Sequence, residues 1–302
     1  MNILITGGAG HIGSFLFREL LKLKKIKKIY IIDSFVSNNF YSVFNIKSKK
    51  LFKINDDILN INLKNISNVQ MVIHLAATTN AEKSFENKKL IYKNLLLTKK
   101  IVEYCNLNKS TLIFPSTTSV YGSSATIVDE SDNKYLNPQS PYAQVKILEE
   151  KYIKNNCRNF KYLIFRMGTI YGISPGIRFH TAINKFCLQL AFSKNITIWR
   201  KNYNFVRPYL CLEDFSQIIY KIINRNFIVY NQIYNLVSNN IKLKDIIKEL
   251  KSIKKNLLIK FVNTKLINQH SYFVSNEKIK KYGFKFTGNL KKHVARTVQL
   301  FI

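Results

Sequence analysis

Several residue types are scarce in this chain of 302 residues, and each scarcity narrows what the protein can be. Only 17 residues are acidic against 48 Lys and Arg, which gives a formal net charge of +31. Glycine (10) and proline (5) are also rare, and eight of the basic residues are Arg, which leaves 40 Lys. Lys, Asn and Ile share AT-rich codons, so a biased genome would give this composition without selection for a polyanionic partner. Phosphate and base recognition favour Arg, and its scarcity therefore disfavours nucleic acid as the partner.

The four cysteines, Cys105, Cys157, Cys187 and Cys211, are far apart and form no CxxC or Cys/His spacing. We therefore expect buried free thiols in a reducing compartment and no metal site. No apolar run approaches the roughly 20 residues of a membrane span, and the chain runs from Met1 straight into a strand and a glycine turn, which predicts no signal peptide. At 46% hydrophobic residues the chain is too apolar for a disordered polycation. We expect a folded cytoplasmic protein that binds neither membrane nor nucleic acid.

Short apolar runs alternate with helical patterns in the first half of the chain. Strands are predicted at 3–5, 29–32, 72–75, 111–114 and 162–165, and helices at 12–23 and about 92–104. Runs of this composition are typical of parallel strands buried on both faces, and the alternation indicates βαβ units. We predict an α/β fold with a doubly wound parallel sheet over 1–165, to which 205–235 returns, and a smaller α/β lobe over 166–204 and 236–302.

Glycine is concentrated where the first predicted strand meets the first predicted helix. Four of the ten glycines lie in TGGAGHIG (6–13), which contains both G-x-x-G-x-x-G and G-x-G-x-x-G. Such a turn lets the backbone approach a pyrophosphate at a helix N-terminus. Asp33 ends the second predicted strand, 20 residues after Gly13, where a carboxylate accepts hydrogen bonds from ribose hydroxyls and repels a 2′-phosphate. The segment predicts NAD as the cofactor, the alternative being a tight turn with a helix-capping Asp.

Tyr142 and Lys146 form an i, i+4 pair on one face of a helix that begins at Ser140-Pro141, an N-cap followed by an N1 proline. The unperturbed pKa of a phenol is near 10, and an ammonium beside it favours the phenolate, as a general base requires. Tyr-x-x-x-Lys is common by chance. The interpretation therefore depends on its position after the fourth predicted strand, which runs into STTSVYG (116–122).

Together these segments resemble the extended short-chain dehydrogenase/reductase family, in its NAD-dependent nucleotide-sugar epimerase/dehydratase (UDP-glucose 4-epimerase-like) branch. The resemblance covers nearly the whole chain, through TGGAGHIG, Asp33, Asp56-Asp57-Ile58, HLAA (74–77), Asn94, STTSVYG, SPYAQVK (140–146), RMGTIYG (166–172), RPYLCLED (207–214) and IYNL (233–236). It implies a Rossmann-type sheet with a substrate-binding lobe, NAD as cofactor, and a homodimer formed through a helix pair beside the Tyr142 helix.

The resemblance also implies roles for single residues. Thr117 matches the family's catalytic hydroxyl, Tyr142 the catalytic base, and Lys146 the residue that holds the nicotinamide ribose and tunes the phenol. The expected cofactor-binding residues are Gly7, Gly10, His11, Ile12, Gly13, Asp33, Ser34, Asp57, Ile58, Leu75, Ala76, Ala77, Asn94, Tyr142 and Lys146. The expected substrate-binding residues are Thr78, Thr118, Thr169, Arg178, Asn184 and Arg207. Arg207 matches an arginine that binds the substrate diphosphate, and the alternative is an ordinary surface arginine. For Asn184 the alternative to substrate binding is an asparagine with no role in the site.

Departures from the family pattern narrow the range of reactions that the protein could catalyse. The 4,6-dehydratases place Asp-Glu after the catalytic Thr, whereas this chain has Thr118-Ser119, which disfavours 4,6-dehydration. The C3/C5-epimerase-reductases use a Cys near the catalytic hydroxyl and a His, but position 119 is Ser and the nearby His180 also fits a surface position. A further phosphate-binding Arg is missing, because 269–272 reads Gln-His-Ser-Tyr, and Arg178 could compensate for it.

The resemblance and its departures imply an NAD-dependent epimerase that acts on a nucleotide-diphosphate sugar through a transient 4-keto intermediate, in the synthesis of cell-surface polysaccharide sugars. Two alternatives stay open. An NAD(P)H-dependent 4-ketosugar-nucleotide reductase would use the same residues. A non-catalytic NAD-binding protein of the same fold would act as a scaffold, a redox sensor or an RNA-binding derivative.

Overall fold

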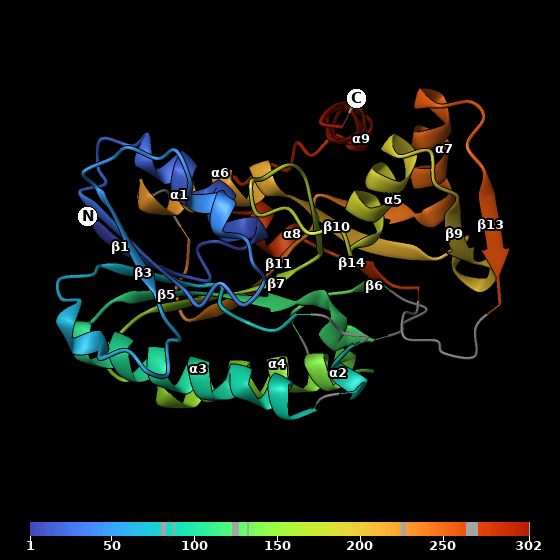
Figure 1. The fold of residues 1–302 in the computed structure, drawn as a ribbon. Helices are drawn as coiled ribbons and strands as arrows, with labels where there is room; N and C mark the ends of the chain where they lie inside the picture. The colour runs from blue at the N-terminus through green and yellow to red at the C-terminus, as the bar shows by residue number, and fades with distance from the viewer. Residues whose placement is uncertain are drawn as a thin grey trace.

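A seven-stranded parallel sheet forms the centre of the molecule (Figure 1). The computed structural model describes residues 1–79, 83–86, 88–122, 127–131, 133–224, 228–263 and 271–301. The strand order is β11-β7-β5-β4-β1-β2-β3, and every neighbouring pair is parallel. The strands are β1 (Asn2–Thr6), β2 (Lys28–Asp33), β3 (Leu51–Asn55), β4 (Met71–His74), β5 (Thr111–Thr117), β7 (Tyr162–Met167) and β11 (Gln232–Leu236). The predicted α/β fold with a Rossmann-type parallel sheet is confirmed.

Helices cover both faces of this sheet, as its apolar strands require. Helices α1 (His11–Leu21) and α6 (Leu212–Ile223) lie on one face, and α3 (Lys88–Asn108) and α4 (Pro141–Asn156) lie on the other, where the short α2 (Lys83–Glu86) precedes α3 (Figure 1). Each layer encloses its own apolar core, one around Leu16, Phe165 and Phe215, the other around Ile101, Phe114 and Ile164. None of the described helices is both long and apolar enough to cross a membrane.

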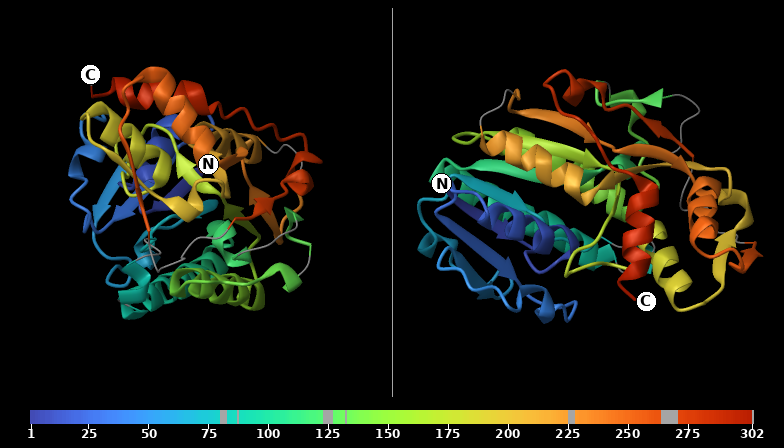
Figure 2. Two further views of the ribbon diagram at one scale, coloured as in Figure 1. Left: turned by 90° about the vertical axis from the view of Figure 1, so that its right-hand side faces the viewer. Right: turned by 90° about the horizontal axis from the view of Figure 1, so that it is seen from above.

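The remaining elements gather at one end of the central sheet (Figure 2). Three small sheets contain β8 (Thr169–Tyr171), β10 (Val206–Cys211) and β12 (Asn239–Lys242); β9 (Ile196–Trp199) and β13 (Ile259–Val262); and β6 (Ile127–Val128) and β14 (Phe273–Val274). The helices here are α5 (Ala182–Ala191), α7 (Leu243–Ile253) and α9 (Leu290–Gln299), whereas the short α8 (Glu277–Lys280) packs against β11 and places Ile279 in the core around Leu16. A third apolar core joins α5, α7 and α9 around Cys187, Ile246 and Val294.

Short 3-10 turns complete the described chain: η1 (Phe40–Val43), η2 (Leu63–Asn65), η3 (Thr118–Tyr121), η4 (Asn133–Tyr135) and η5 (Arg200–Asn202). All four cysteines are free thiols, three of them buried and Cys157 half-buried. The segments that follow β1, β2, β4 and β5 leave the sheet at the carboxyl ends of parallel strands, which lie at one edge. In open α/β sheets ligands bind at this edge, so the functional site is expected there.

Candidate functional site

A cavity of about 790 Å³ opens at the carboxyl ends of the central strands. One wall is formed by the loops that follow these strands, and the other by residues of the smaller lobe such as Lys185, Trp199 and Arg207. Every residue that the sequence predicts as catalytic or cofactor-binding lies on this lining, as do five of the six predicted substrate-binding residues. The exception is Asn184, which is fully buried beneath the lining and donates its amide to the Arg178 carbonyl oxygen over 3.1 Å.

The glycine turn between β1 and α1 forms the floor of the cavity. Gly7 has φ +69°, a left-handed conformation that favours glycine. A Cβ at Gly13 would lie 2.4 Å from the Gly7 carbonyl oxygen, so only glycine lets α1 approach the turn this closely. The first turn of α1 begins at His11, and its free N–H groups make an anion site of this helix end.

Two carboxylates hold the loops beside this turn. Asp33, at the end of β2, accepts the Ala9 N–H at 2.9 Å with one oxygen and the Phe35 N–H at 2.9 Å with the other. Asp57 accepts the Leu59 N–H at 3.0 Å and is paired with Lys93. Desolvation raises the pKa of Asp57, but the hydrogen bond and charge of Lys93 and the Leu59 N–H outweigh it and lower the pKa overall.

Asn94 has a positioning role in this structure. Its side chain accepts the Thr78 N–H at 2.8 Å and donates to the Thr78 carbonyl oxygen at 2.9 Å. Both polar ends of the buried Asn94 amide are thus used to fix the loop after β4. The residue lies on the cavity lining as predicted, and what it visibly does is shape the wall that carries Ala77 and Thr78.

Thr117, Tyr142 and Lys146 come together on one wall. Thr117 ends β5, and Tyr142 and Lys146 lie on the first turns of α4, where the Ser140 hydroxyl accepts the Ala143 N–H at 3.2 Å as an N-cap. The Tyr142 phenol is hydrogen-bonded to the Thr117 hydroxyl. Burial raises the pKa of Tyr142, while the charges of Lys146 and Arg178 and the bond to Thr117 oppose the rise. The protonated Tyr142 phenol is therefore surrounded by groups that favour its ionised form.

Glu149 is a member of this constellation that the sequence analysis missed. Its Oε2 lies 3.1 Å from Lys146 Nζ, with the two side chains 1% and 4% exposed, and Lys146 Nζ lies 4.4 Å from the centre of the Phe114 ring. The opposing negative charge of Glu149 raises the pKa of Tyr142. The i, i+3 spacing between Lys146 and Glu149 could have indicated that the two side chains pair. That spacing does not show that both groups are buried.

A line of hydrogen bonds runs from Glu149 to the start of the glycine turn. Thr98 donates to Glu149 Oε1 at 2.5 Å, so its oxygen accepts from His74 Nε2 at 3.3 Å. His74 Nδ1 then accepts from the Thr6 hydroxyl at 2.7 Å. Burial and the nearby Lys146 lower the pKa of His74 to about 3, so the imidazole stays neutral with its proton on Nε2. One buried network thereby joins Glu149, the partner of Lys146, to the start of the glycine turn.

The two predicted arginines lie at different places on the lining. Arg178 donates to Thr79 Oγ1 at 2.6 Å, and its Nη2 lies 3.6 Å from where a Cβ on Gly10 would be, which places it at the glycine turn. Arg207 lies in β10 with its guanidinium 5.0 Å from the centre of the Tyr272 ring. The guanidinium groups of Arg178 and Arg207 thus lie in separate regions of the cavity.

Other predicted positions have mixed surroundings. The Thr118 hydroxyl, on the lining, is bonded to the Met167 carbonyl oxygen at 3.3 Å and the Tyr272 hydroxyl at 3.2 Å. His180, which the sequence left open, is an exposed residue on the lining. Gln269 and His270, where the second phosphate-binding Arg was missing, lie outside the described residues.

Comparison with known proteins places this architecture in a family. The sequence model of the NAD dependent epimerase/dehydratase family matches residues 3–236. A dTDP-D-glucose 4,6-dehydratase of Dictyostelium discoideum is 34% identical over 252 residues, which cover 76% of this chain and 57% of that protein. An uncharacterised UDP-glucose epimerase of Bacillus subtilis (strain 168) is 33% identical over 203 residues, 63% of each protein. The chain thus spans less than two thirds of the length of these relatives.

Solved structures share the fold over the whole chain. The UDP-N-acetylglucosamine 4-epimerase from Methanobrevibacter ruminantium M1, in complex with UDP-N-acetylmuramic acid, has a TM-score of 0.87 at 21% identity and covers 99% of this chain and 97% of its own. The UDP-glucuronic acid 4-epimerase from Bacillus cereus, in complex with UDP-glucuronic acid and NAD, has a TM-score of 0.85 at 24% identity and covers 100% and 99%. With the family match over most of the sequence and the glycine turn, Thr117, Tyr142 and Lys146 on one cavity, the chain belongs to the NAD-dependent epimerase/dehydratase family.

Proposed function

We propose that this protein is an NAD-dependent epimerase that inverts C4 of a nucleotide-diphosphate sugar through a transient 4-keto intermediate, within the synthesis of cell-surface polysaccharide sugars. The observation that carries the proposal is the meeting of Thr117, Tyr142 and Lys146 on the same cavity as the glycine turn. In this proposal residues 1–165 with 205–235 bind the cofactor, and residues 166–204 and 236–302 bind the nucleotide sugar.

The cavity floor fits NAD. Glycine at position 13 lets α1 approach the turn, because a Cβ there would lie 2.4 Å from the Gly7 carbonyl oxygen, and the N-terminus of α1 lies on the cavity lining with free N–H groups. Arg178 adds a cation at the same turn, so the diphosphate would lie between backbone donors and a guanidinium. Asp33 would accept the adenosine ribose hydroxyls with its remaining lone pairs. When bound, NAD⁺ supplies the hydride acceptor and a positive ring charge that favours the Tyr142 phenolate.

The protein's own contribution is the movement of one proton. The Tyr142 phenolate takes the proton of the sugar 4-hydroxyl, which Thr117 orients by a hydrogen bond. Tyr142 then holds that proton while the 4-keto sugar turns its other face to the cofactor, and returns it to the new 4-hydroxyl. Lys146, fixed by Glu149 at 3.1 Å, keeps a positive charge beside the phenol during both transfers.

The positions of the carboxylates in the cavity favour epimerisation over 4,6-dehydration, because dehydration needs an acidic side chain beside the catalytic hydroxyl. Among the residues of the lining, carboxylates occur at Asp33, Asp56 and Asp57, which follow β2 and β3 on the cofactor side. The positions after Thr117 hold Thr118 and Ser119 instead. Aliphatic hydroxyls are too weakly acidic to protonate a leaving group, so the C6 hydroxyl would be retained.

The test is to incubate the purified protein with UDP-, dTDP-, GDP- and CDP-sugars, with and without NADH, and to resolve the products. We expect a 4-epimer without net consumption of cofactor. Product that forms only with stoichiometric oxidation of NADH would replace the epimerase by a 4-ketosugar reductase. Tyr142→Phe should lower kcat roughly 10²–10⁴-fold, whereas Tyr220→Phe, at a 42% exposed position on α6, should leave it unchanged. Full activity of Tyr142→Phe would refute the catalytic assignment.

We propose that the protein is a homodimer formed through α3 and α4. These helices lie side by side as the outer layer on one face of the sheet (Figure 1), and they expose Tyr92 and Leu96 (each 51%) and Leu148 (40%). A second copy packed on this layer would bury these side chains in a four-helix arrangement. Sedimentation should give twice the chain mass, and Leu96→Glu with Leu148→Glu should give monomers. A monomeric wild-type protein at micromolar concentration would exclude this proposal.

A further inference from the structure

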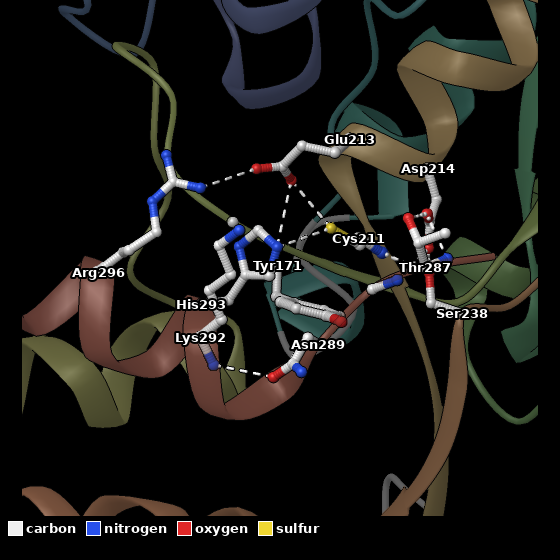
Figure 3. A network of polar contacts seen from close by, with 12 residues as sticks. Tyr171, Cys211, Glu213, Asp214, Ser238, Thr287, Asn289, Lys292, His293 and Arg296 are labelled. Atoms are coloured by element: carbon white, nitrogen blue, oxygen red, sulfur yellow. Dashed lines mark hydrogen bonds and ion pairs between the residues drawn. The ribbon is translucent and has the colours of Figure 1, made fainter.

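Three side chains that can bind a metal converge outside the cavity. Cys211 ends β10, Glu213 lies in the first turn of α6, and His293 lies in the first turns of α9. Cys211 Sγ is 2.9 Å from Glu213 Oε2 and 3.1 Å from His293 Nε2, and His293 Nε2 is 3.5 Å from Glu213 Oε2. Figure 3 shows the three side chains pointing toward one another. None of them belongs to the cavity lining, so the catalytic proposal does not use them.

The size of this triangle suits a tetrahedral ion. Zn²⁺ binds sulfur at about 2.3 Å, imidazole nitrogen at about 2.0–2.1 Å and carboxylate oxygen at about 2.0–2.2 Å. Tetrahedral angles then separate nitrogen from oxygen by roughly 3.3–3.5 Å, and sulfur from either of them by roughly 3.5–3.7 Å. The Nε2–Oε2 separation of 3.5 Å already has this size. The sulfur, now 2.9 and 3.1 Å from its two neighbours, would have to withdraw from them by roughly 0.4–0.8 Å.

The surroundings hold the ligands in place. Arg296 Nη1 lies 3.5 Å from Glu213 Oε1, which leaves Oε2 to the cluster. The His293 imidazole packs edge-on against Tyr171, with ring centres 5.3 Å apart and planes at 86°. The Cys211 N–H donates to Ser238 Oγ at 2.9 Å. Partners of this kind orient metal ligands, and here they fix both the backbone and the side chains.

The burial of the three side chains indicates how many ligands a bound ion would have. Cys211 is 1% and His293 6% exposed, whereas the Glu213 side chain is 36% exposed, so solvent reaches the cluster from the side of Glu213. Three protein ligands and one water complete a tetrahedron. In the ligand-free structure the Cys211 thiol donates its hydrogen to Glu213 Oε2. Binding would release that proton to solvent, and Zn²⁺ with one thiolate and one carboxylate is neutral, as a buried site requires.

We propose that Cys211, Glu213 and His293 bind one Zn²⁺ ion, which fastens the last helix, α9, to the junction of β10 and α6. The donor set of one sulfur, one nitrogen and one oxygen favours zinc over magnesium or calcium, which take oxygen ligands. The ion joins segments 82 residues apart. It would stabilise the end of the strand whose other end carries Arg207, a role independent of the proposed reaction.

The test uses tag-free, chelator-stripped protein titrated with Zn²⁺ in the presence of a competing chromophoric chelator, and with Co²⁺ followed by absorption. We expect one Zn²⁺ per chain and a thiolate-to-cobalt charge-transfer band. Cys211→Ser should abolish the band and, like His293→Gln, weaken Zn²⁺ binding at least 100-fold. Cys187→Ser is the matched control, because this buried cysteine also packs against α9, with Sγ 4.0 Å from the Val294 carbonyl oxygen, but outside the cluster; it should keep both signals.

Several results would overturn the proposal: no stoichiometric Zn²⁺ on the wild-type chain, a cobalt spectrum without a thiolate band, or Zn²⁺ affinity unchanged by Cys211→Ser and His293→Gln. If Cys211→Ser does not fold, the wild-type cobalt spectrum and His293→Gln decide. Sugar-nucleotide turnover is not a readout, so failure of the zinc site and failure of the proposed epimerase are separate outcomes.

Discussion

The buried ion pair between Glu150 and Arg166 should be among the most sensitive points of the fold. Arg166 Nη2 lies 2.7 Å from Glu150 Oε2 and Arg166 Nε lies 3.1 Å from Oε1, a bidentate pair that is 3–4% exposed. Ser116 also donates to Oε1 at 2.5 Å, and Arg166 donates to the Tyr121 hydroxyl at 3.1 Å. Glu150→Gln would leave the guanidinium buried without a countercharge.

Breaking such a pair from one side costs about 3–5 kcal/mol of unfolding free energy. At the roughly 2–4 °C per kcal/mol found for chains of 150–250 residues, Glu150→Gln should lower the thermal midpoint by roughly 6–20 °C. Differential scanning calorimetry of the ligand-free protein measures this directly. Glu277→Gln is the matched control, because it removes the same charge from an exposed pair with Lys280, 70% and 44% exposed at 2.8 Å. An exposed pair contributes less than about 1 kcal/mol.

The double variant Glu150→Leu, Arg166→Met separates burial of a lone charge from loss of the pair. Replacing both members of a buried pair by apolar residues is often close to neutral, so the double variant should unfold at a higher temperature than Glu150→Gln alone. The reasoning is wrong if Glu150→Gln shifts the midpoint by less than about 2 °C, or if the double variant is less stable than the single one.

Three further predictions follow from the site. Gly13→Ala would place a Cβ 2.4 Å from the Gly7 carbonyl oxygen and should weaken NAD binding at least about tenfold by calorimetry. Burial lowers the pKa of His11 to about 4, whereas the unfolded chain binds this proton below about pH 6.5. Stability should therefore fall by up to roughly 3 kcal/mol as the pH drops from 6.5 to 4, and His11→Gln should flatten that slope in thermal unfolding. Glu149→Gln should leave Lys146 buried without its carboxylate, costing about 3–5 kcal/mol of stability and lowering kcat in the epimerase assay.

The central sheet could be predicted from the sequence where burial is complete. β1, β4 and β7 are apolar runs buried over nearly their whole length, and composition alone identifies them. β3 was missed because it is an edge strand, LFKIN, with a half-exposed and exposed pattern and polar residues inside the run. This edge strand is defined by its pairing with β2, whose residues are 22 positions away in the sequence, and such pairing leaves no periodic signal in one sequence.

The site could be predicted where spacing along the chain fixes neighbours in space. The glycine turn and the Tyr142–Lys146 pair are local, and both lie on the cavity. Contacts between distant segments were missed. Cys211 and His293 are 82 residues apart, so the sequence predicted no metal site where the structure carries a candidate. Arg178 lies on the cavity as predicted, but its approach to the glycine turn depends on a loop whose course no local pattern indicates.

The few acidic residues explain how a chain of net charge +31 keeps its fold. Over the part of the chain that the structure describes, the buried carboxylates are Glu149, Glu150 and Asp214. The first two face Lys146 and Arg166, while Asp214 accepts the N–H groups of Thr287 at 2.8 Å and Gly288 at 3.0 Å. Loss of any of these acids would leave a cation or an amide buried without a partner, at a cost comparable to a large fraction of total stability. Exposed acids carry no such cost, so a drift toward lysine can proceed at the surface and must stop at these three positions. The net charge is therefore a property of the surface. The charges that help to identify the site are the few buried ones, each of which needs a partner in the interior.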